Sequence, residues 1–168
     1  MADDYGGIVG AFPYAFRASD SRLFRSYVVL GGLLTVAVAL LFVTAVIGVI
    51  AGTVGGGGTL TLSRSFFAVV GLLVVVPLVA PVLFVARRHR RAGGSDGRYD
   101  AGLAASGYLF ALSLYVGVVA SVPPAQQATP TGTLAPVVAA LYGLPQLVGI
   151  GPPLVAAGLF LLVHRWLR

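Results

Sequence analysis

Apolar residues fill four long stretches of the chain, and charged residues occur only outside them. No charged side chain occurs in residues 26–63, 65–86 or 101–163. Crossing the roughly 30 Å hydrocarbon core of a bilayer takes about 20 apolar residues, since each adds 1.5 Å of helix. The stretches long enough to do so are about 27–54, 66–86, 103–122 and 144–163. We therefore predict an all-α integral membrane bundle of four transmembrane helices.

The N-terminal 26 residues precede the first span and mix aromatic with charged side chains. Residues 12–17 read Phe-Pro-Tyr-Ala-Phe-Arg, a mixture typical of segments that lie at the lipid headgroups. We predict a cytoplasmic interfacial segment over residues 1–26 and a transmembrane domain over 27–168. Ser19 or Asp20 is expected to cap the helix that continues into the first span.

A shorter apolar stretch at residues 134–143 precedes the fourth span. A helix of this length reaches about half of the hydrocarbon thickness, and the prolines and glycines between 145 and 153 break or kink any continuation of it. We predict a short extracytoplasmic helix here. Whether it is interfacial, re-entrant or part of the fourth span stays open.

The basic residues lie almost entirely on one side of the predicted bundle. Arg17, Arg22 and Arg25 precede the first span, five Arg lie between the second and third spans, and Arg165 and Arg168 follow the fourth; only Arg64 lies on the other side. Lys and Arg accumulate on cytoplasmic loops. We therefore expect a multi-pass protein of the cell membrane with both termini in the cytoplasm.

The composition excludes several classes of function. Charged residues make up 10% of the chain, against roughly 25% in ordinary soluble domains. All 11 basic residues are Arg and all 5 acidic residues are Asp, and the chain contains no Cys. Lysine chemistry and thiolate chemistry are therefore excluded. We expect no metal and no cofactor. We also expect no nucleic-acid partner, because membrane topology explains the net charge of +6.

The loop after the second span contains the candidate contact residues for a partner. These are Arg87, Arg88, Arg90, Arg91 and Arg98. Clustered cations next to a membrane helix bind anionic lipid headgroups, and an acidic protein partner is equally compatible with them. The alternative is that the cluster only sets the topology.

Small residues and prolines inside the spans predict how the helices pack. Residues at four-residue spacing form two stripes, one of Thr44, Gly48 and Gly52 and one of Ser113, Gly117 and Ser121. Such stripes let helices approach closely, either within one chain or between the chains of a homo-oligomer. Pro77 and Pro81 predict a kink in the second span.

Three classes of function are compatible with these features. The first is a non-catalytic membrane scaffold or complex subunit that acts through its Arg-rich cytoplasmic face. The second is an oligomeric pore or carrier subunit for a small solute. The third is a membrane enzyme at the cytoplasmic face, whose chemistry would rest on Asp96, Asp100, His89 or His164. We expect the first class, without catalytic residues. No span contains Asp, Arg or His, which argues against coupled transport.

The use of Arg without Lys and Asp without Glu, among many Ala, Gly and Val, resembles proteins of halophilic archaea. The run from Gly10 to Arg22, Gly-Ala-Phe-Pro-Tyr-Ala-Phe-Arg-Ala-Ser-Asp-Ser-Arg, resembles the opening of small uncharacterised multi-pass membrane proteins of that group. This resemblance implies a membrane location, and it implies no activity and no site residues.

Overall fold

The computed structural model describes residues 6–52, 59–92 and 97–167. Every regular element within these residues is a helix. The elements are α1 (Gly7–Ala18), α2 (Arg22–Ala51), α3 (Thr59–Ala92), α4 (Gly97–Ala120), η1 (Pro124–Gln126), α5 (Ala135–Tyr142), η2 (Gln146–Ile150) and α6 (Gly151–Trp166). Four of them, α2, α3, α4 and α6 with η2, are long and apolar enough to cross a membrane. The prediction of an all-α bundle with four spanning helices is confirmed.

The long helices extend past the apolar stretches at their polar ends. α2 begins at Arg22, α3 continues to Ala92, and α4 begins at Gly97. A helix satisfies its own backbone hydrogen bonds in lipid and in water alike, so it has no reason to end where the hydrocarbon ends. Residues 53 and 54, the expected end of the first span, lie outside the described residues.

The cap of α2 differs from the prediction. The Ser21 hydroxyl accepts the hydrogen bond of the Phe24 backbone N–H at 3.2 Å, so Ser21 is the N-cap. Neither Ser19 nor Asp20 takes this role. The Ser19 hydroxyl is instead turned into the bundle, where it donates to Asp100.

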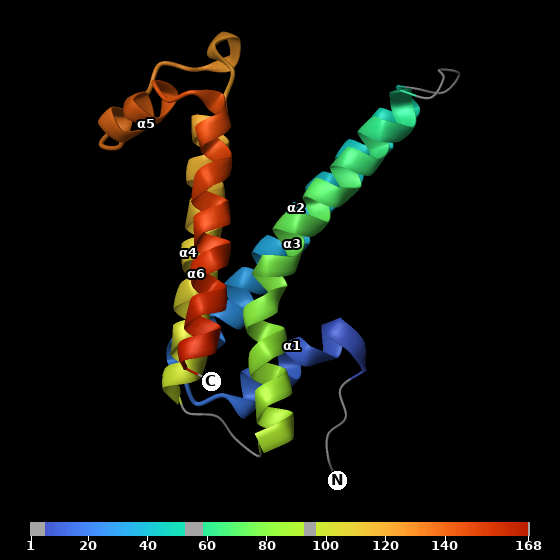
Figure 1. Cartoon of the computed structure of the whole chain (residues 1–168), viewed down its shortest axis with the longest axis vertical. Coiled ribbons are helices and arrows are strands. Elements are labelled where there is room, and N and C mark those ends of the chain that lie inside the picture. The colour runs from blue at the N-terminus through green and yellow to red at the C-terminus, as the bar shows by residue number, and fades with distance from the viewer. Residues whose placement is uncertain (1–5, 53–58, 93–96, 168) are drawn as a thin grey trace.

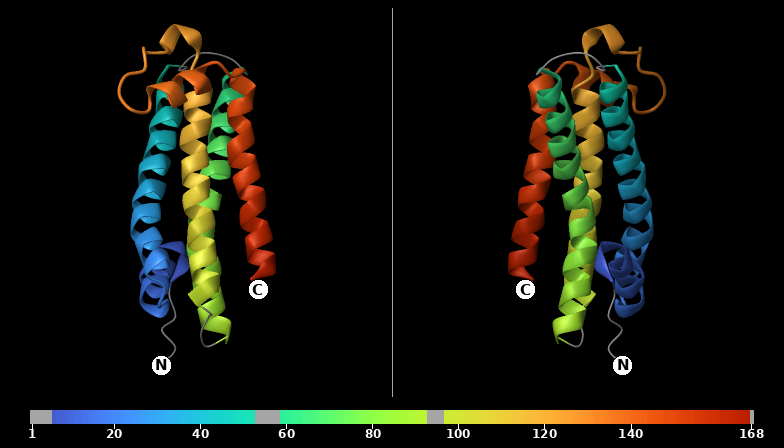
Figure 2. Two further views of the ribbon diagram at one scale, coloured as in Figure 1. Left: turned by 90° about the vertical axis from the view of Figure 1, so that its left-hand side faces the viewer. Right: turned by 90° about the vertical axis from the view of Figure 1, so that its right-hand side faces the viewer.

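The four long helices form two arms that diverge from a shared base (Figure 1). α2 pairs with α3, and α4 pairs with α6. Two further views, each at right angles to Figure 1, show the four long helices running roughly along the long axis (Figure 2). The buried core is concentrated at the base, where α1 packs against α3 through Ala11 and Ala15. Its largest buried side chains include Phe24, Tyr27 and Tyr99.

α5 lies at the opposite end of the molecule from the base and projects sideways from the α4–α6 arm (Figure 1). It is a separate helix of 8 residues, Ala135–Tyr142, and none of its residues is buried. η2 comes after it and leads directly into α6. The stretch at 134–143 is therefore structurally distinct from α6, and its extracytoplasmic position stays a prediction.

Candidate functional site

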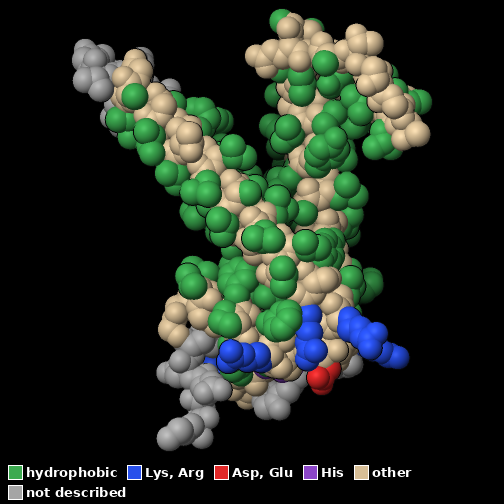
Figure 3. All heavy atoms as spheres, turned by 180° about the vertical axis from the view of Figure 1, so that it is seen from behind, with side chains coloured by type: hydrophobic (Ala, Val, Ile, Leu, Met, Phe, Trp, Pro, Cys, Tyr) green, Lys and Arg blue, Asp and Glu red, His purple; other side chains and the backbone are tan. Residues whose placement is uncertain are grey.

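Arg side chains from five segments gather at the base of the bundle. The segments that meet there are α1, the start of α2, the end of α3, the start of α4 and the end of α6 (Figure 1). We call this base the Arg-rich end, and all Arg side chains that the structure describes belong to it: Arg17, Arg22, Arg25, Arg87, Arg88, Arg90, Arg91, Arg98 and Arg165. The face in Figure 3 shows basic side chains gathered at this end and hydrophobic ones along both arms. Folding thus brings together charges that are far apart in the sequence.

The five predicted contact residues do not have equivalent positions. Arg87, Arg90, Arg91 and Arg98 are exposed, whereas Arg88 is half-buried. The Arg88 guanidinium lies over the Tyr99 ring, 4.1 Å from its centroid, and its Nη1 donates to the Leu167 carbonyl at 2.9 Å. Arg88 therefore joins α3 to α4 and to the end of α6, while the exposed members face outward.

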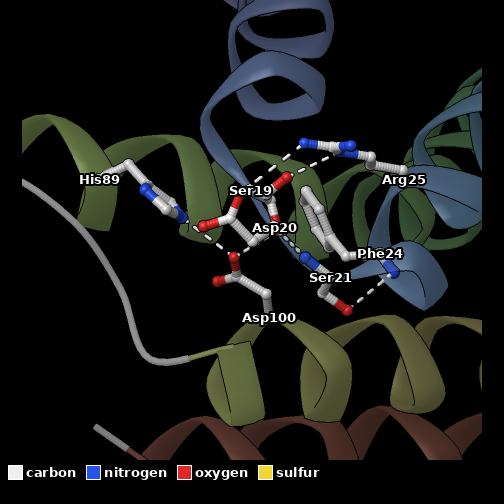
Figure 4. Close-up of polar contacts among 7 residues, drawn as sticks. All are labelled: Ser19, Asp20, Ser21, Phe24, Arg25, His89 and Asp100. Atoms are coloured by element: carbon white, nitrogen blue, oxygen red, sulfur yellow. Dashed lines mark hydrogen bonds and ion pairs between the residues drawn. The ribbon is translucent and has the colours of Figure 1, made fainter.

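At the Arg-rich end, inside the bundle, lies a polar cluster of Ser19, His89 and Asp100 (Figure 4). The Ser19 Oγ donates to the Asp100 Oδ2 at 2.5 Å, and the His89 Nε2 lies 3.0 Å from the same oxygen. The side chain of Asp100 is 1% exposed and that of His89 is 9% exposed. A buried carboxylate needs such hydrogen bonds because it has lost those of water. The cluster joins the α1–α2 junction to α3 and α4.

Arg25 holds the other side of the α1–α2 junction. Its Nε donates to the Ser19 carbonyl at 2.8 Å, and its Nη2 lies 3.8 Å from the Asp20 carboxylate. The Ser19 Oγ also accepts the backbone N–H of Ser21 at 3.2 Å. Both ends of the short segment between α1 and α2 are therefore fixed, and this places Ser19 against Asp100.

A second polar contact joins α4 to α6. The Tyr99 hydroxyl lies 2.9 Å from the His164 Nδ1. The His164 ring packs against the ring of Phe84 of α3 in a tilted arrangement, with the centroids 4.3 Å apart. This Tyr99–His164 pair is separate from the contact between His89 and Asp100. Both contacts lie between helices and contribute to the same layer at the Arg-rich end.

The arrangement of Ser19, His89 and Asp100 differs from that of a nucleophilic triad. In a triad the histidine lies between the serine and the acid, so that it takes the serine proton. Here Asp100 lies in the middle and the Ser19 hydroxyl donates to it. Among the described residues, no three His, Asp, Glu or Cys side chains gather as metal ligands would.

The structure brings together only part of the set named for enzyme chemistry. His89 and Asp100 are in contact, whereas His164 is bonded to Tyr99. Asp96 lies outside the described residues. Nothing in the sequence marks Ser19 and Tyr99 as site residues, because partners 81 and 65 positions away along the chain leave no local signal.

The two small-residue stripes lie away from the Arg-rich end and have different surroundings. A Cβ at Gly117 would overlap the Gly149 carbonyl, and the Ser121 hydroxyl donates to the Gln146 carbonyl at 3.3 Å. That stripe of α4, with Ser113 buried, thus faces η2 and α6. Thr44, Gly48 and Gly52 are exposed on α2, and a Cβ at Gly48 would meet nothing within 4 Å.

Four long apolar helices, whose described side chains are mostly exposed and hydrophobic, together with the Arg-rich end, indicate a membrane-embedded helical protein. The chain belongs to the family described as Domain of unknown function (DUF8056), whose model matches residues 1–168. No curated protein and no solved structure matches it. The resemblance to proteins of halophilic archaea stays a prediction.

Proposed function

We propose that the protein is a non-catalytic integral membrane component whose Arg-rich end binds anionic phospholipid headgroups at the cytoplasmic face of the cell membrane. The convergence of Arg side chains from five segments on one end of the bundle carries this proposal. Two acidic residues are described at this end, and neither fully neutralises the positive charge of the exposed Arg side chains. Asp100 is buried, and the carboxylate of Asp20 faces Arg25.

The exposed apolar and aromatic residues at the same end support a position at the headgroups. Trp166 is 86% exposed, and Phe16 and Leu23 are also exposed. Trp and other amphipathic rings collect where hydrocarbon meets water. Each Arg near an anionic surface contributes about 1 kcal/mol of attraction, which salt weakens. Several exposed Arg at this depth would therefore hold anionic lipids next to the bundle.

The burial of the polar cluster supports a non-catalytic role. Ser19 and Asp100 are enclosed between α1, α3 and α4, so a substrate would have to displace a helix to reach them. A catalytic group must lie within hydrogen-bond reach of its substrate. The topology of the proposal, with the Arg-rich end in the cytoplasm, rests on the positive-inside rule.

The test compares retained lipid in two charge variants. The protein is purified from bilayers of phosphatidylcholine with and without phosphatidylglycerol, and native mass spectrometry counts the lipids that stay bound. The double variant Arg87→Gln/Arg91→Gln removes two exposed charges, while Arg88, which joins helices, is left in place. We expect this variant to retain fewer phosphatidylglycerol molecules than the unmodified protein. Raising the salt concentration should also remove fewer of these lipids from the variant than from the unmodified protein.

The matched control is Arg64→Gln, which removes an identical charge near the opposite end of α3. It should leave the retained phosphatidylglycerol unchanged. Equal lipid retention in the double variant and in the unmodified protein would contradict the proposal. Loss of a co-purified acidic protein, with lipid retention unchanged, would also contradict it and would assign the Arg-rich end to a protein partner.

A further inference from the structure

Most of the buried contacts between the two arms lie near the Arg-rich end. A smaller cluster of Leu78, Phe110 and Ala156, against which Val38 and Val74 pack, joins the arms further along. In α2 the buried residues are Phe24, Tyr27, Val28 and Gly31, and none is found from Gly32 to Ala51. Among the described side chains of α3 between Ser65 and Pro77, only Gly71 is buried, and it packs against Phe42 of α2. Beyond Val38 and Val74, the buried contact of the described α2–α3 arm lies within the arm itself, between Gly71 and Phe42. Figure 3 shows the hollow that separates the two arms there, with hydrophobic side chains on both sides.

Residues that weaken or bend helices gather where the large core at the Arg-rich end gives way to the small cluster of Leu78, Phe110 and Ala156. Pro77 and Pro81 lie one turn apart in α3. Neither has an N–H group, so the carbonyls of Leu73 and Pro77 lose their helical hydrogen bonds. Gly31 and Gly32 lie at the same level of α2, beside Tyr27 and Phe12. Both helices of the α2–α3 arm thus contain a weak turn next to the small cluster of Leu78, Phe110 and Ala156.

Tyr27 occupies the centre of this level. Its hydroxyl donates to the Leu78 carbonyl at 2.7 Å, within the turn bounded by Pro77 and Pro81. Its ring lies so close to Gly107 of α4 that a Cβ there would overlap it, and it makes an edge contact with Tyr108 at 5.1 Å between centroids. Tyr27 therefore links α2 both to the proline turn of α3 and to the glycine of α4.

We propose that the α2–α3 arm swings about a hinge formed by Tyr27, Pro77 and Pro81, and that this motion opens and closes the apolar cleft between the two arms. The Arg-rich end stays closed during the motion, because the polar cluster and the Tyr99–His164 pair join α1, α3, α4 and α6 below the hinge. Hinge closure of this kind concentrates the change of backbone angles in a few residues. Beyond the hinge the arm has few buried contacts with α4 and α6 to lose when it moves, chiefly those of Val38 and Val74 with the small cluster.

The test measures distances between spin labels in lipid nanodiscs. The chain contains no cysteine, so two introduced cysteines are the only labelled sites. One pair, Ile47→Cys with Val118→Cys, lies on exposed positions near the open ends of α2 and α4. The reference pair, Leu23→Cys with Trp166→Cys, lies on exposed positions at the Arg-rich end. We expect at least two distance populations for the first pair and a single narrow one for the reference pair.

Two changes at the hinge should alter only the first pair. Pro77→Ala/Pro81→Ala restores two N–H groups to α3, so it should remove one of the two populations. Tyr27→Phe keeps the ring but removes the bond to the Leu78 carbonyl, so it should change the ratio of the populations. The control Pro136→Ala, in the first turn of α5 where no helical bond is lost, should have no effect.

The outcome that would overturn the hinge is a single narrow distribution for the Ile47–Val118 pair, as narrow as that of the reference pair and unchanged by Tyr27→Phe. Tyr27→Phe provides this answer even if the double alanine variant does not fold. Lipid retention at the Arg-rich end is measured separately, so failure of the hinge and failure of the lipid proposal are distinguishable.

Discussion

Asp100 is the residue whose environment differs most from what its position in the sequence indicates. It stands in the first turn of α4, where the positive end of the helix dipole favours a carboxylate, and this position alone would place it at the surface. The structure buries it and gives it Ser19 and His89 as partners. The local sequence indicates a helix start, while the cost of burying the charge is offset by residues from two other segments.

Replacement of Asp100 by alanine should destabilise the protein. The change leaves the Ser19 hydroxyl and the His89 ring without a shared acceptor in a buried site, which costs about 1–3 kcal/mol for each polar group left unsatisfied. Thermal unfolding in detergent measures the loss. Asp20→Ala is the control, because Asp20 is fully exposed and lies 3.8 Å from Arg25, and it should leave the unfolding temperature unchanged. Equal unfolding temperatures for both variants would show that the polar cluster does not stabilise the fold.

At the scale of the helices, two stripes that look alike in the sequence have different roles. Gly117 of α4 faces the Gly149 backbone and Pro153, whereas Gly48 of α2 faces open space. Periodicity alone cannot separate these cases, because inward and outward faces of membrane helices are equally apolar. The identity of the neighbour, which the fold supplies, decides whether a glycine is needed.

The substitution Gly117→Leu should therefore lower the stability, and Gly48→Leu should not. A leucine at Gly117 would push η2 and α6 away from α4, with a cost on the order of 1–3 kcal/mol by analogy with overpacked cores. Thermal unfolding in detergent and native mass spectrometry are the measurements. If Gly48→Leu leaves the stability unchanged but lowers the oligomer mass, the exposed stripe of α2 joins two copies of the chain. Identical behaviour of the two variants would contradict the assignment of Gly117 to the α4–η2 contact.

The helices themselves are predictable from the sequence, but their caps and contacts are less so. An uninterrupted apolar stretch of about 20 residues is sufficient to predict a spanning helix, and the structure contains all four. The predicted cap of α2 is wrong because Ser19 and Ser21 are chemically identical and only two residues apart. The distant Asp100 distinguishes them, since it binds the hydroxyl of Ser19 and leaves Ser21 to cap Phe24.

At the scale of the whole molecule, the sequence predicts that distant Arg residues share one end, and it cannot predict how the helices pair. The alternation of spans requires the segments with Arg17, Arg87 and Arg165 to lie on the same side, and the structure places them at one end. The pairing of α2 with α3 and of α4 with α6 depends on side-chain shape, for example at Gly71 and Gly117. Hydropathy contains no information about such shapes.

The orientation in the membrane can be tested by thiol labelling, since the chain has no cysteine of its own. A cysteine at Ala128, an exposed position in the segment after η1, should react with a membrane-impermeant maleimide added to intact cells. A cysteine at Trp166, which is 86% exposed at the Arg-rich end, should react only after the cells are opened. The reverse pattern would overturn the cytoplasmic assignment of the Arg-rich end.

The divergence of the two arms makes the protein wider at the α5 end than at the Arg-rich end (Figure 1). A bilayer around such a wedge must make room for a larger protein cross-section in one leaflet than in the other. A curved membrane provides this asymmetry, because its convex leaflet has more area than its concave one. With the arms apart, we therefore expect the free energy of the embedded protein to depend on membrane curvature and to be lowest in bilayers whose convex leaflet surrounds the α5 end.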